Sequence, residues 1–466
     1  MPIQTLNPAT GQLVRIFDAH DAAFVDAALE RAATAWRHWR TLAVADRARV
    51  VHRAGELLDE RREALARLMT TEMGKPVQAA RDEAAKCALA CRWYAEHAER
   101  ILAPETLLDD ESGTGTVHYQ PLGPVLAVMP WNFPFWQVIR FAAPALVAGN
   151  VGLLKHASNV PQCALALETL FRDAGAPVGV FQTLLVEAGR VADLIADARV
   201  AAVTLTGSEG AGAQVGAAAG THLKKSVLEL GGSDPFVVLP SADLARAAST
   251  AVTARTINNG QSCIAAKRFV VHADVYDAFL ERMVAAMRAL RVGDPMDDAT
   301  QIGPLATAQI RDEVHEQVER SVASGARLLC GAEKLAGPGF FYAPTVLADV
   351  PRDAAAACEE VFGPVAAVFR AGSVDEALAI ANDTPYGLGS AVWTRDAAEI
   401  ARFTEGLEAG SVFVNGMVSS DPRLPFGGIK RSGYGRELAF VGLREFVNVK
   451  TVRTARDGAR THDTTE

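Results

Sequence analysis

One of the six cysteines differs from the other five in its surroundings. Cys263 lies in NNGQSCIAAKR, a polar, glycine-containing segment directly before an apolar run. A thiol in such a loop can be exposed and activated as a nucleophile, whereas most cysteines are inert core residues. No two cysteines form a CxxC pair, which disfavours a disulfide framework or a zinc site. Cys87 and Cys91 lie one helical turn apart, but without a nearby histidine pair we expect buried thiols and no metal.

A carboxylate and an amide occur where each could assist such a thiol. Glu229, in LELGGSDP, ends an apolar run, so partial burial could raise its pKa towards that of a useful base. The same sequence is equally compatible with a glutamate on an edge strand whose side chain points to solvent. Asn132, in MPWNFPFW, could be a rigid donor to an oxyanion or the cap of a helix. The residues alone leave both alternatives open.

A third segment, VTLTGSEGAGAQVG, reads as a strand, a glycine turn and the start of a helix. Backbone N–H groups at Gly207 and the dipole of the helix would suit a phosphate. The spacing of Gly210, Gly212 and Gly216 is one residue wider than in the usual dinucleotide-binding motif. Tight helix packing at Gly212 and Gly216 explains the glycines equally well.

The elements that position these residues change in type along the chain. Apolar positions at helical spacing predict that the first hundred residues are helical, with helices over 21–39, 45–74 and 77–100. Gly74 and Pro76 end the second helix. From residue 113 onwards, short apolar strands alternate with helices, which predicts parallel, doubly wound sheets. The pattern repeats after Gly231–Gly232, where we place a boundary between two α/β domains.

Composition limits the classes of function. The 466 residues are 49% hydrophobic and 22% charged, as in a soluble globular protein of at least two domains. A net charge of -9 argues against a nucleic-acid partner. The N-terminal segment lacks the pattern of a secretory signal, and the most apolar stretch, 121–149, is interrupted by polar residues and prolines. We expect no membrane partner and a cytoplasmic location.

Taken in order, the motifs resemble the aldehyde dehydrogenase superfamily. They are PWNFP, LLKH, TGS, LELGG, GQSC, EEVFGP and PFGGIKRSGYGRE, and the resemblance runs from Asn7 to Glu445. It implies an aldehyde dehydrogenase-like α/β fold with two doubly wound parallel-sheet domains, a small β oligomerisation flap, and a homodimer or homotetramer. The expected parts are a dinucleotide-binding domain (1–102 and 121–230), a catalytic domain (231–442), the flap (103–120 and 443–455) and a flexible tail (456–466).

The same resemblance implies a role for each candidate residue. Cys263 matches the family nucleophile, Glu229 the general base and Asn132 the amide of the oxyanion hole. Residues that match cofactor contacts are Trp131, Lys155, Ser158, Gly207, Ser208, Leu230, Glu360 and Phe362. The implied reaction is NAD(P)-dependent: the thiolate attacks an aldehyde to give a thiohemiacetal, oxidation gives a thioester, and water activated by Glu229 hydrolyses it.

Within the superfamily the chain looks most similar to bacterial succinate-semialdehyde dehydrogenases, which implies oxidation of succinate semialdehyde to succinate. Arg140 matches an arginine that binds the substrate carboxylate, and Ser420 matches a second contact. Arg140 as a surface helix residue is the competing interpretation. Many relatives carry another arginine where this chain has Ile257; Arg255 is the nearest arginine and Arg423 could supply the charge. Glutarate semialdehyde and other short ω-oxo acids stay open.

Cofactor choice depends on the third residue after Lys155. NAD-preferring relatives often carry a glutamate there, which repels a 2′-phosphate, whereas this chain has Ser158. Serine can accommodate the phosphate, and His156 could add positive charge. We expect NAD to be used, with NADP tolerated.

Three rival functions are compatible with the family. A coenzyme-A-acylating enzyme and a broad-specificity aldehyde dehydrogenase are disfavoured by Glu229 together with Arg140. A structural or binding protein without turnover would be expected to lack the nucleophile or the base, and this chain retains both Cys263 and Glu229.

Overall fold

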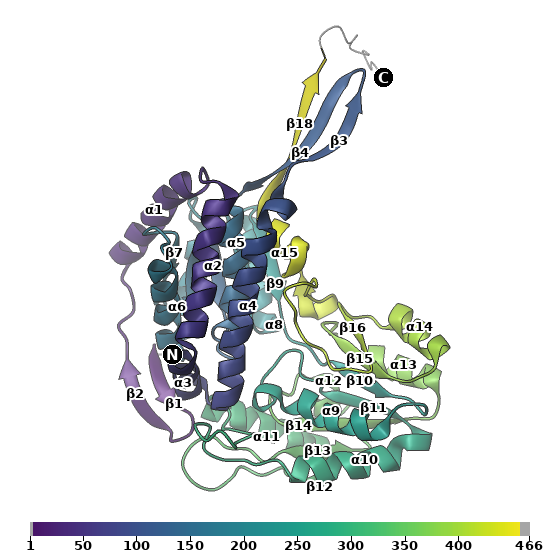
Figure 1. Cartoon of the computed structure of the whole chain (residues 1–466). Coiled ribbons are helices and arrows are strands. Elements are labelled where there is room, and N and C mark those ends of the chain that lie inside the picture. The colour runs from purple at the N-terminus through teal and green to yellow at the C-terminus, as the bar shows by residue number, and fades with distance from the viewer. Residues whose placement is uncertain (1–2, 457–466) are drawn as a thin grey trace.

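A six-stranded sheet forms the centre of the first α/β domain in the computed structural model, which describes residues 3–456 (Figure 1). Its order is β17-β9-β8-β5-β6-β7, and β5 to β9 are parallel. The bounds are β5 Pro124–Met129, β6 Val151–His156, β7 Phe181–Thr183, β8 Ala202–Thr206, β9 Lys225–Glu229 and β17 Gly433–Tyr434. Strands β5 to β8 are almost wholly buried, as expected for a parallel sheet covered by helices on both faces.

A seven-stranded sheet forms the second domain, in the order β12-β13-β14-β11-β10-β15-β16. The bounds are β10 Pro235–Val238, β11 Arg268–His272, β12 Arg327–Cys330, β13 Thr345–Ala348, β14 Val365–Ala371, β15 Ser390–Trp393 and β16 Val412–Val414. Only the edge strand β12 runs antiparallel to its neighbour. The chain passes from the first sheet to the second between β9 and β10. The expected α/β class with doubly wound sheets is therefore confirmed.

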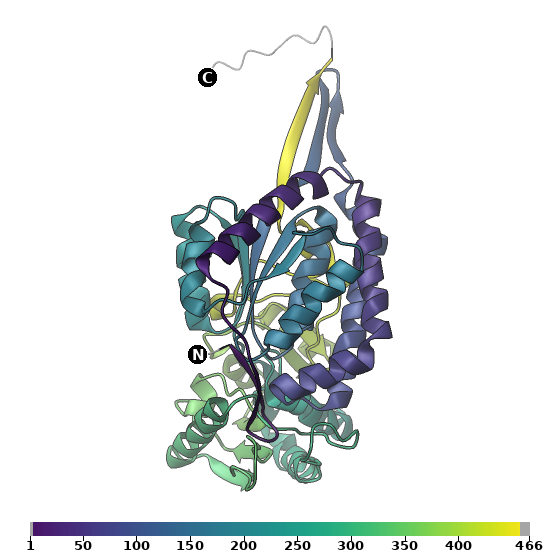
Figure 2. The ribbon, with the colours of Figure 1, turned by 90° about the vertical axis from the view of Figure 1, so that its left-hand side faces the viewer.

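Helices cover the two sheets (Figures 1 and 2). Those around the first sheet are α1 Ala22–Trp39, α2 Val44–Glu60, α3 Arg62–Met73, α4 Val77–Leu102, α5 Trp136–Ala148, α6 Pro161–Asp173, α7 Val191–Ala196 and α8 Glu209–Thr221. Those of the second domain are α9 Leu244–Thr256, α10 Ala273–Arg288, α11 Ala308–Ala323, α12 Ala355–Cys358, α13 Val374–Asn382 and α14 Ala397–Gly406. α15 (Ala439–Arg444) packs on α4 and α5. No helix among residues 3–456 is long and apolar enough to cross a membrane.

A three-stranded antiparallel sheet projects from the first domain (Figure 2). It consists of β3 (Glu105–Asp110), β4 (Gly113–Pro121) and the C-terminal β18 (Val447–Ala455), in the order β18-β4-β3. Leu107 and Val449 on this flap are 72% and 61% exposed. Apolar side chains this exposed on a projecting sheet indicate a surface that another chain could cover.

Three details differ from the sequence-based expectations, and one prediction lies outside the described residues. The N-terminal segment begins with a hairpin of β1 (Gln4–Asn7) and β2 (Gln12–Ile16), not with a helix. The helix predicted over 45–74 is interrupted at Arg61, although no glycine or proline stands there to predict a break. β17, predicted within the catalytic domain, pairs with β9 of the first sheet, because residues after 430 return to the first domain. The predicted tail lies outside the described residues from 457 onwards.

Candidate active site

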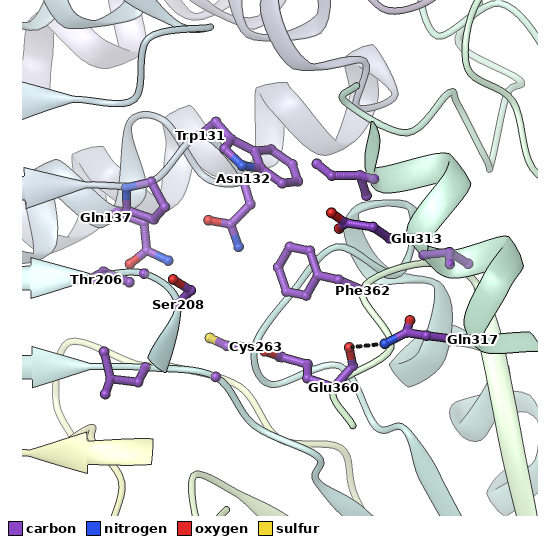
Figure 3. Close-up of a pocket in the computed structure, with 16 residues that line it drawn as sticks. Trp131, Asn132, Gln137, Thr206, Ser208, Cys263, Glu313, Gln317, Glu360 and Phe362 are labelled. Atoms are coloured by element: carbon purple, nitrogen blue, oxygen red, sulfur yellow. Dashed lines mark hydrogen bonds between the residues drawn. The ribbon is translucent and has the colours of Figure 1, made fainter. Parts of the chain in front are cut away.

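A first cavity of about 290 Å³ opens at the carboxyl ends of β5, β8 and β9 (Figure 3). This edge of a doubly wound sheet is where such folds bind ligands. The first domain contributes Trp131, Asn132, Gln137, Thr206, Gly207, Ser208 and Leu230, and the second contributes Cys263, Glu313, Gln317, Glu360 and Phe362. The structure thus brings together eight of the residues singled out in the sequence.

A second cavity of about 210 Å³ lies on the other side of Cys263. Its walls are largely apolar, and its polar side chains include Lys86, Arg140 and Ser420. The apolar side chains are Phe133, Trp136, Ile257, Ile264 and Phe426. Cys263 and Gln137 line both cavities. The thiol therefore lies where two differently built cavities meet.

The segment before Cys263 has an unusual backbone. Asn258 and Asn259 have φ values of 54° and 59°, and Gly260 follows at 77°. Asparagine tolerates this left-handed region better than most residues. Asn258 Nδ2 donates to the carbonyl of Asn132 at 2.8 Å, and Asn259 Nδ2 donates to the carbonyl of Pro304 at 2.9 Å. Long-range hydrogen bonds thus hold the left-handed turn that presents the thiol.

Lys267 fastens the same loop from behind. Its buried Nζ donates to the carbonyls of Ser262 and Cys263, both at 2.9 Å, and lies 3.2 Å from Glu360 Oε1. Glu360 Oε1 also accepts the N–H of Gly232 at 3.1 Å. Three segments that meet at the first cavity are therefore joined through one ammonium and one carboxylate.

Asn132 lies at the end of β5 with its amide directed into the site (Figure 3). Nδ2 donates one hydrogen to the carbonyl of Gln261 at 3.1 Å, two residues before the thiol. An amide nitrogen carries two hydrogens, so one remains for a further acceptor. Asn132 is buried, which suits a fixed donor better than a surface helix cap.

Burial raises the pKa of the Cys263 thiol to about 12, although the positive charges of Arg140 and Lys267 oppose this shift. Almost all of the thiol is therefore protonated at neutral pH. A reaction at Cys263 needs a base or a further positive charge to release the proton.

Glu229 is buried at the end of β9, but it lines neither cavity in this structure. A Cβ placed on Gly427 would lie 2.7 Å from Glu229 Oε1, so the carboxyl group points towards the C-terminal segment. Burial raises the pKa of Glu229 well above its usual range, and the nearby Glu437 raises it further. The residue is not an exposed edge-strand glutamate, and its side chain lies outside the lining of both cavities.

Arg140 is buried in α5, and its guanidinium already has partners within the protein. Its Nε forms an ion pair with Glu437, and its Nη2 donates to Thr206 Oγ1 at 3.2 Å. The guanidinium also lies over the ring of Phe426, 4.8 Å from the centroid. Arg140 is thus no surface residue, and it lines the second cavity with its charge compensated. Ser420 lines the same cavity and accepts a hydrogen bond from Lys86 Nζ at 2.7 Å.

The two arginines considered as substitutes at the Ile257 position do not reach the second cavity. Arg255 is fully buried and donates from Nη2 to the carbonyl of Gly260 at 2.6 Å. Arg423 points to solvent and pairs with Asp421 at 2.6 Å. The expectation that Arg423 supplies the missing charge is therefore wrong, because its own neighbour in sequence neutralises it.

A third cavity of about 200 Å³ lies beside α8 and contains Lys155 at the end of β6. Lys155 is buried, burial lowers its pKa, and no carboxylate among residues 3–456 lies within ion-pair distance. Ser158 follows β6 but does not line this cavity. His156 is buried with Nε2 against the carbonyl of Pro134 at 2.9 Å, and burial lowers its pKa to about 4. His156 is therefore neutral and adds no positive charge, contrary to expectation.

The glycines of α8 have separate functions in the fold. A Cβ at Gly212 would lie 2.5 Å from Leu230, and one at Gly216 would lie 3.3 Å from Leu228. Both glycines let α8 pack closely on β9. Gly207 and Ser208 instead border the first cavity, where the N-terminus of α8 begins. The helix-packing interpretation is the better one for Gly212 and Gly216, and an anion could bind only near Gly207.

Three residues of the site were missed by the sequence interpretation: Lys86, Lys267 and Glu437. Lys86 stands in EAAKCALA, among small apolar residues of a helix, which is an unusual setting for a lysine. Lys267 follows the thiol by four residues, and Glu437 ends the GYGRE motif. The residues that these three side chains contact lie far away in the sequence, so the local sequence gave little indication of their roles.

Known proteins resemble the chain over nearly its whole length. The pattern of the "Aldehyde dehydrogenase family" matches residues 1–452. "Succinate-semialdehyde dehydrogenase [NADP(+)] 1" of Mycobacterium bovis is 58% identical over 97% of this chain and 99% of the relative. "Succinate-semialdehyde dehydrogenase [NADP(+)]" of Mycolicibacterium paratuberculosis is 56% identical over 97% and 96%. The crystal structure of succinic semialdehyde dehydrogenase from Streptococcus pyogenes in complex with NADP+ has a TM-score of 0.95, 37% identity, and coverage of 97% and 100%.

Proposed function

The chain belongs to the aldehyde dehydrogenase family, and we propose that it oxidises succinate semialdehyde to succinate with NADP+. The observation that carries the proposal is the position of Cys263 between two cavities. One lies at the strand ends where a dinucleotide binds, and the other combines apolar walls with Lys86, Arg140 and Ser420. A short aldehyde with an anionic end matches the second cavity in both respects.

The residues present fit a nicotinamide dinucleotide. Lys155 is a buried cation without a carboxylate partner among residues 3–456, and the N-terminus of α8 borders the first cavity through Gly207 and Ser208. Both features favour phosphate and ribose groups. Trp131, Leu230, Glu360 and Phe362 would hold the remainder of the cofactor. The chemistry that the bound cofactor supplies is acceptance of a hydride.

In the proposed mechanism Cys263 Sγ loses its proton to Glu229, directly or through water, and bonds to the aldehyde carbon. The carbonyl oxygen becomes negative and accepts hydrogen bonds from Asn132 Nδ2 and the N–H of Cys263. Loss of one such donor typically costs about 10²–10³ in rate. After oxidation to a thioester, Glu229 releases the thiol proton to solvent and then removes a proton from water. The hydroxide adds to the carbonyl carbon, and the adduct collapses to the acid and the Cys263 thiolate.

The raised pKa of Glu229 supports its role as the base. A carboxyl group of ordinary pKa would be a weak proton acceptor at neutral pH, whereas burial and the nearby Glu437 make Glu229 more basic. Its present position beside Gly427 keeps it away from the path of the aldehyde. We therefore place a rotation of this side chain before each proton transfer.

A preference for NADP over NAD is the second part of the proposal, and it reverses the order expected from the sequence. The mycobacterial relatives and the streptococcal structure are named with NADP+. Ser158 offers no negative charge against a 2′-phosphate, and Lys155 offers an uncompensated positive charge. His156 takes no part because it is neutral and faces Pro134.

We also propose that the flap joins subunits into a homodimer or homotetramer. A small sheet with exposed apolar residues is marginally stable in water, and pairing with a second copy would cover Leu107 and Val449. Size-exclusion chromatography with light scattering tests this: wild type is expected above the mass of one chain, and Val449→Asp shifted towards it. A wild-type monomer would contradict the proposal.

The test of the function compares three aldehydes with two cofactors. Reduction of NADP and NAD is followed with succinate semialdehyde, glutarate semialdehyde and uncharged butanal. We expect kcat/KM to be highest for succinate semialdehyde with NADP. Equal values for semialdehyde and butanal would remove the substrate assignment, and the highest value with glutarate semialdehyde would change the chain length. No reduction with any aldehyde would overturn the enzymatic assignment.

A further inference from the structure

Lys86 extends from α4 into the second cavity. Its Nζ donates to Ser420 Oγ at 2.7 Å and lies over the ring of Trp136, 4.4 Å from the centroid. Trp136 and Ser420 also line the cavity. A hydroxyl and an aromatic face together orient an ammonium group, but neither neutralises its charge.

The acidic groups nearest to Lys86 already have partners. Glu83, one turn earlier on α4, forms a buried ion pair with Lys75 and accepts the N–H groups of Phe135 and Trp136, both at 2.9 Å. Asp421 pairs with Arg423 at 2.6 Å. Asp82 accepts a hydrogen bond from Gln78 at 3.0 Å. Among residues 3–456, no carboxylate lies within 4.0 Å of Lys86 Nζ, so its charge is uncompensated.

Arg140 differs from Lys86 in this respect. The Arg140 guanidinium is paired with the Glu437 carboxyl group, and Thr206 accepts a further hydrogen bond from it. Of the two cationic side chains that line the second cavity, Arg140 has a carboxylate partner and Lys86 has none within ion-pair distance among residues 3–456. The position that carries an arginine in many relatives is the apolar Ile257 on the same cavity wall. Without Lys86, the cationic side chain left in the lining of this cavity is Arg140, which is already paired with Glu437.

We propose that Lys86 binds the carboxylate of the substrate directly and sets the preference for aldehydes with an anionic end. The proposal rests on the proposed function and adds a residue to it. Ser420 orients the ammonium and shares the carboxylate, while Phe133, Trp136 and Phe426 enclose the methylene chain. Because Lys86 is half-buried and the cavity walls are largely apolar, this ion pair is stronger than a surface pair.

A pH dependence follows from the same geometry. Burial and the positive charge of Arg140 lower the pKa of Lys86 to about 8, although nearby acidic groups oppose the shift. The groups that face Lys86 from the surrounding elements are Asp82, Glu83 and Cys87 on α4, Arg140 on α5, Cys263, and Asp421. Below pH 8 the ammonium is charged and binds a carboxylate; above pH 8 it loses its proton. KM for the semialdehyde therefore rises above pH 8, whereas KM for butanal does not follow this titration.

The test uses Lys86→Met, Lys86→Arg and the matched control Lys334→Met, which removes a surface lysine paired with Asp312. The readout is the ratio of kcat/KM for succinate semialdehyde to that for butanal. We expect the ratio to fall at least tenfold in Lys86→Met, to be retained within about threefold in Lys86→Arg, and to equal wild type in Lys334→Met. Lys86→Arg also loses the rise of KM above pH 8, because arginine stays charged.

A binding measurement separates this inference from the proposed function. Succinate is added while iodoacetamide alkylates Cys263, and the rate is followed by peptide mass analysis. We expect succinate to slow the alkylation of Cys263 in wild type and in Lys86→Arg at similar concentrations. In Lys86→Met, the succinate concentration needed for the same protection should be at least tenfold higher. A wild type without preference for the semialdehyde contradicts the proposed function and, with it, this inference. If Lys86→Met keeps the wild-type preference for the semialdehyde, the role of Lys86 is overturned while the proposed function stands. If Lys86→Met does not fold, a KM–pH profile in Lys86→Arg that equals that of wild type overturns the role of Lys86.

Discussion

Lys267 Nζ lies 3.2 Å from Glu360 Oε1, and this ion pair connects the loop of Cys263 to the segment that carries Glu360 and Phe362 into the first cavity. The same ammonium holds the carbonyls of Ser262 and Cys263. Since the carbonyl of the nucleophile is itself one of these acceptors, Lys267 positions the thiol without lining either cavity. A displacement of about 1 Å at a reacting atom can lower the rate strongly, so we expect the contacts of Lys267 to affect catalysis.

Lys267→Met is expected to lower kcat by about 10²-fold, because the thiol loop loses its anchor. It also leaves the partly exposed Glu360 carboxylate and several buried carbonyls without their cation, so the thermal midpoint is expected to fall. The measurements are steady-state kinetics and the thermal midpoint, with Lys334→Met as the control. A variant with wild-type kcat would show that the loop is held by other contacts.

Glu229→Gln is expected to slow both proton transfers, so that a thioester forms on Cys263 more slowly than in wild type and is then hydrolysed more slowly still. Glutamine keeps the size of the side chain but cannot take a proton from water. Mixing the variant with cofactor and succinate semialdehyde should therefore give a burst of reduced cofactor and an acylated Cys263 peptide by mass analysis. The exposed Glu408→Gln is the matched control. If the variant shows neither burst nor acylated peptide, deprotonation of the thiol is the slower of the two steps that need Glu229, and the expectation that hydrolysis is slower is wrong.

The sequence predicted the alternation of strands and helices because each buried strand is a short apolar run bounded by turn residues. β5, β6 and β8 all occur where those runs predicted them. The N-terminal hairpin was missed, because β2 is wholly exposed and has no pattern of burial to detect. The break at Arg61 was missed for a related reason: residues on both sides favour a helix, and only packing separates α2 from α3.

The site could be predicted only as far as its motifs are local. Cys263, Asn132 and Glu360 were found in short motifs, and all three line the first cavity. The pair of Arg140 with Glu437, by contrast, joins residues about 300 positions apart in the sequence, so that no local pattern records it. Contacts of this kind, and the resulting charge of each group, required the folded structure.

Arg140→Met is expected to destabilise the protein more than Arg140→Met/Glu437→Gln. The single variant leaves Glu437 buried without its cation, which typically costs about 3–5 kcal/mol, whereas the double variant removes both charges. Thermal midpoints of wild type, both single variants and the double variant form the required cycle. Equal midpoints for Arg140→Met and the double variant would mean that Glu437 does not depend on Arg140.

Alkylation of Cys263 by iodoacetamide in the absence of ligands is expected to accelerate about tenfold per pH unit from pH 6 to pH 10. The reason is that only the thiolate reacts, and burial places the pKa of this thiol at about 12, above the whole range. The Cys263 peptide is quantified separately from that of the exposed Cys358. A plateau near neutral pH would indicate that a base already holds the proton in the resting protein.

Ser158→Glu is expected to lower kcat/KM with NADP at least tenfold and to change kcat/KM with NAD much less. Ser158 follows β6, three residues after Lys155, and a carboxylate there would both repel a 2′-phosphate and compensate the charge of Lys155. Ser158→Ala is the matched control: it removes the hydroxyl without adding charge, so a loss confined to glutamate identifies electrostatics as the cause. Ser158 lies outside the lining of the third cavity. A small change in the preference for NADP would therefore indicate that Lys155 accounts for most of the selection of the 2′-phosphate. An unchanged NADP to NAD ratio in Ser158→Glu would assign the selection to Lys155 and remove Ser158 from the cofactor site.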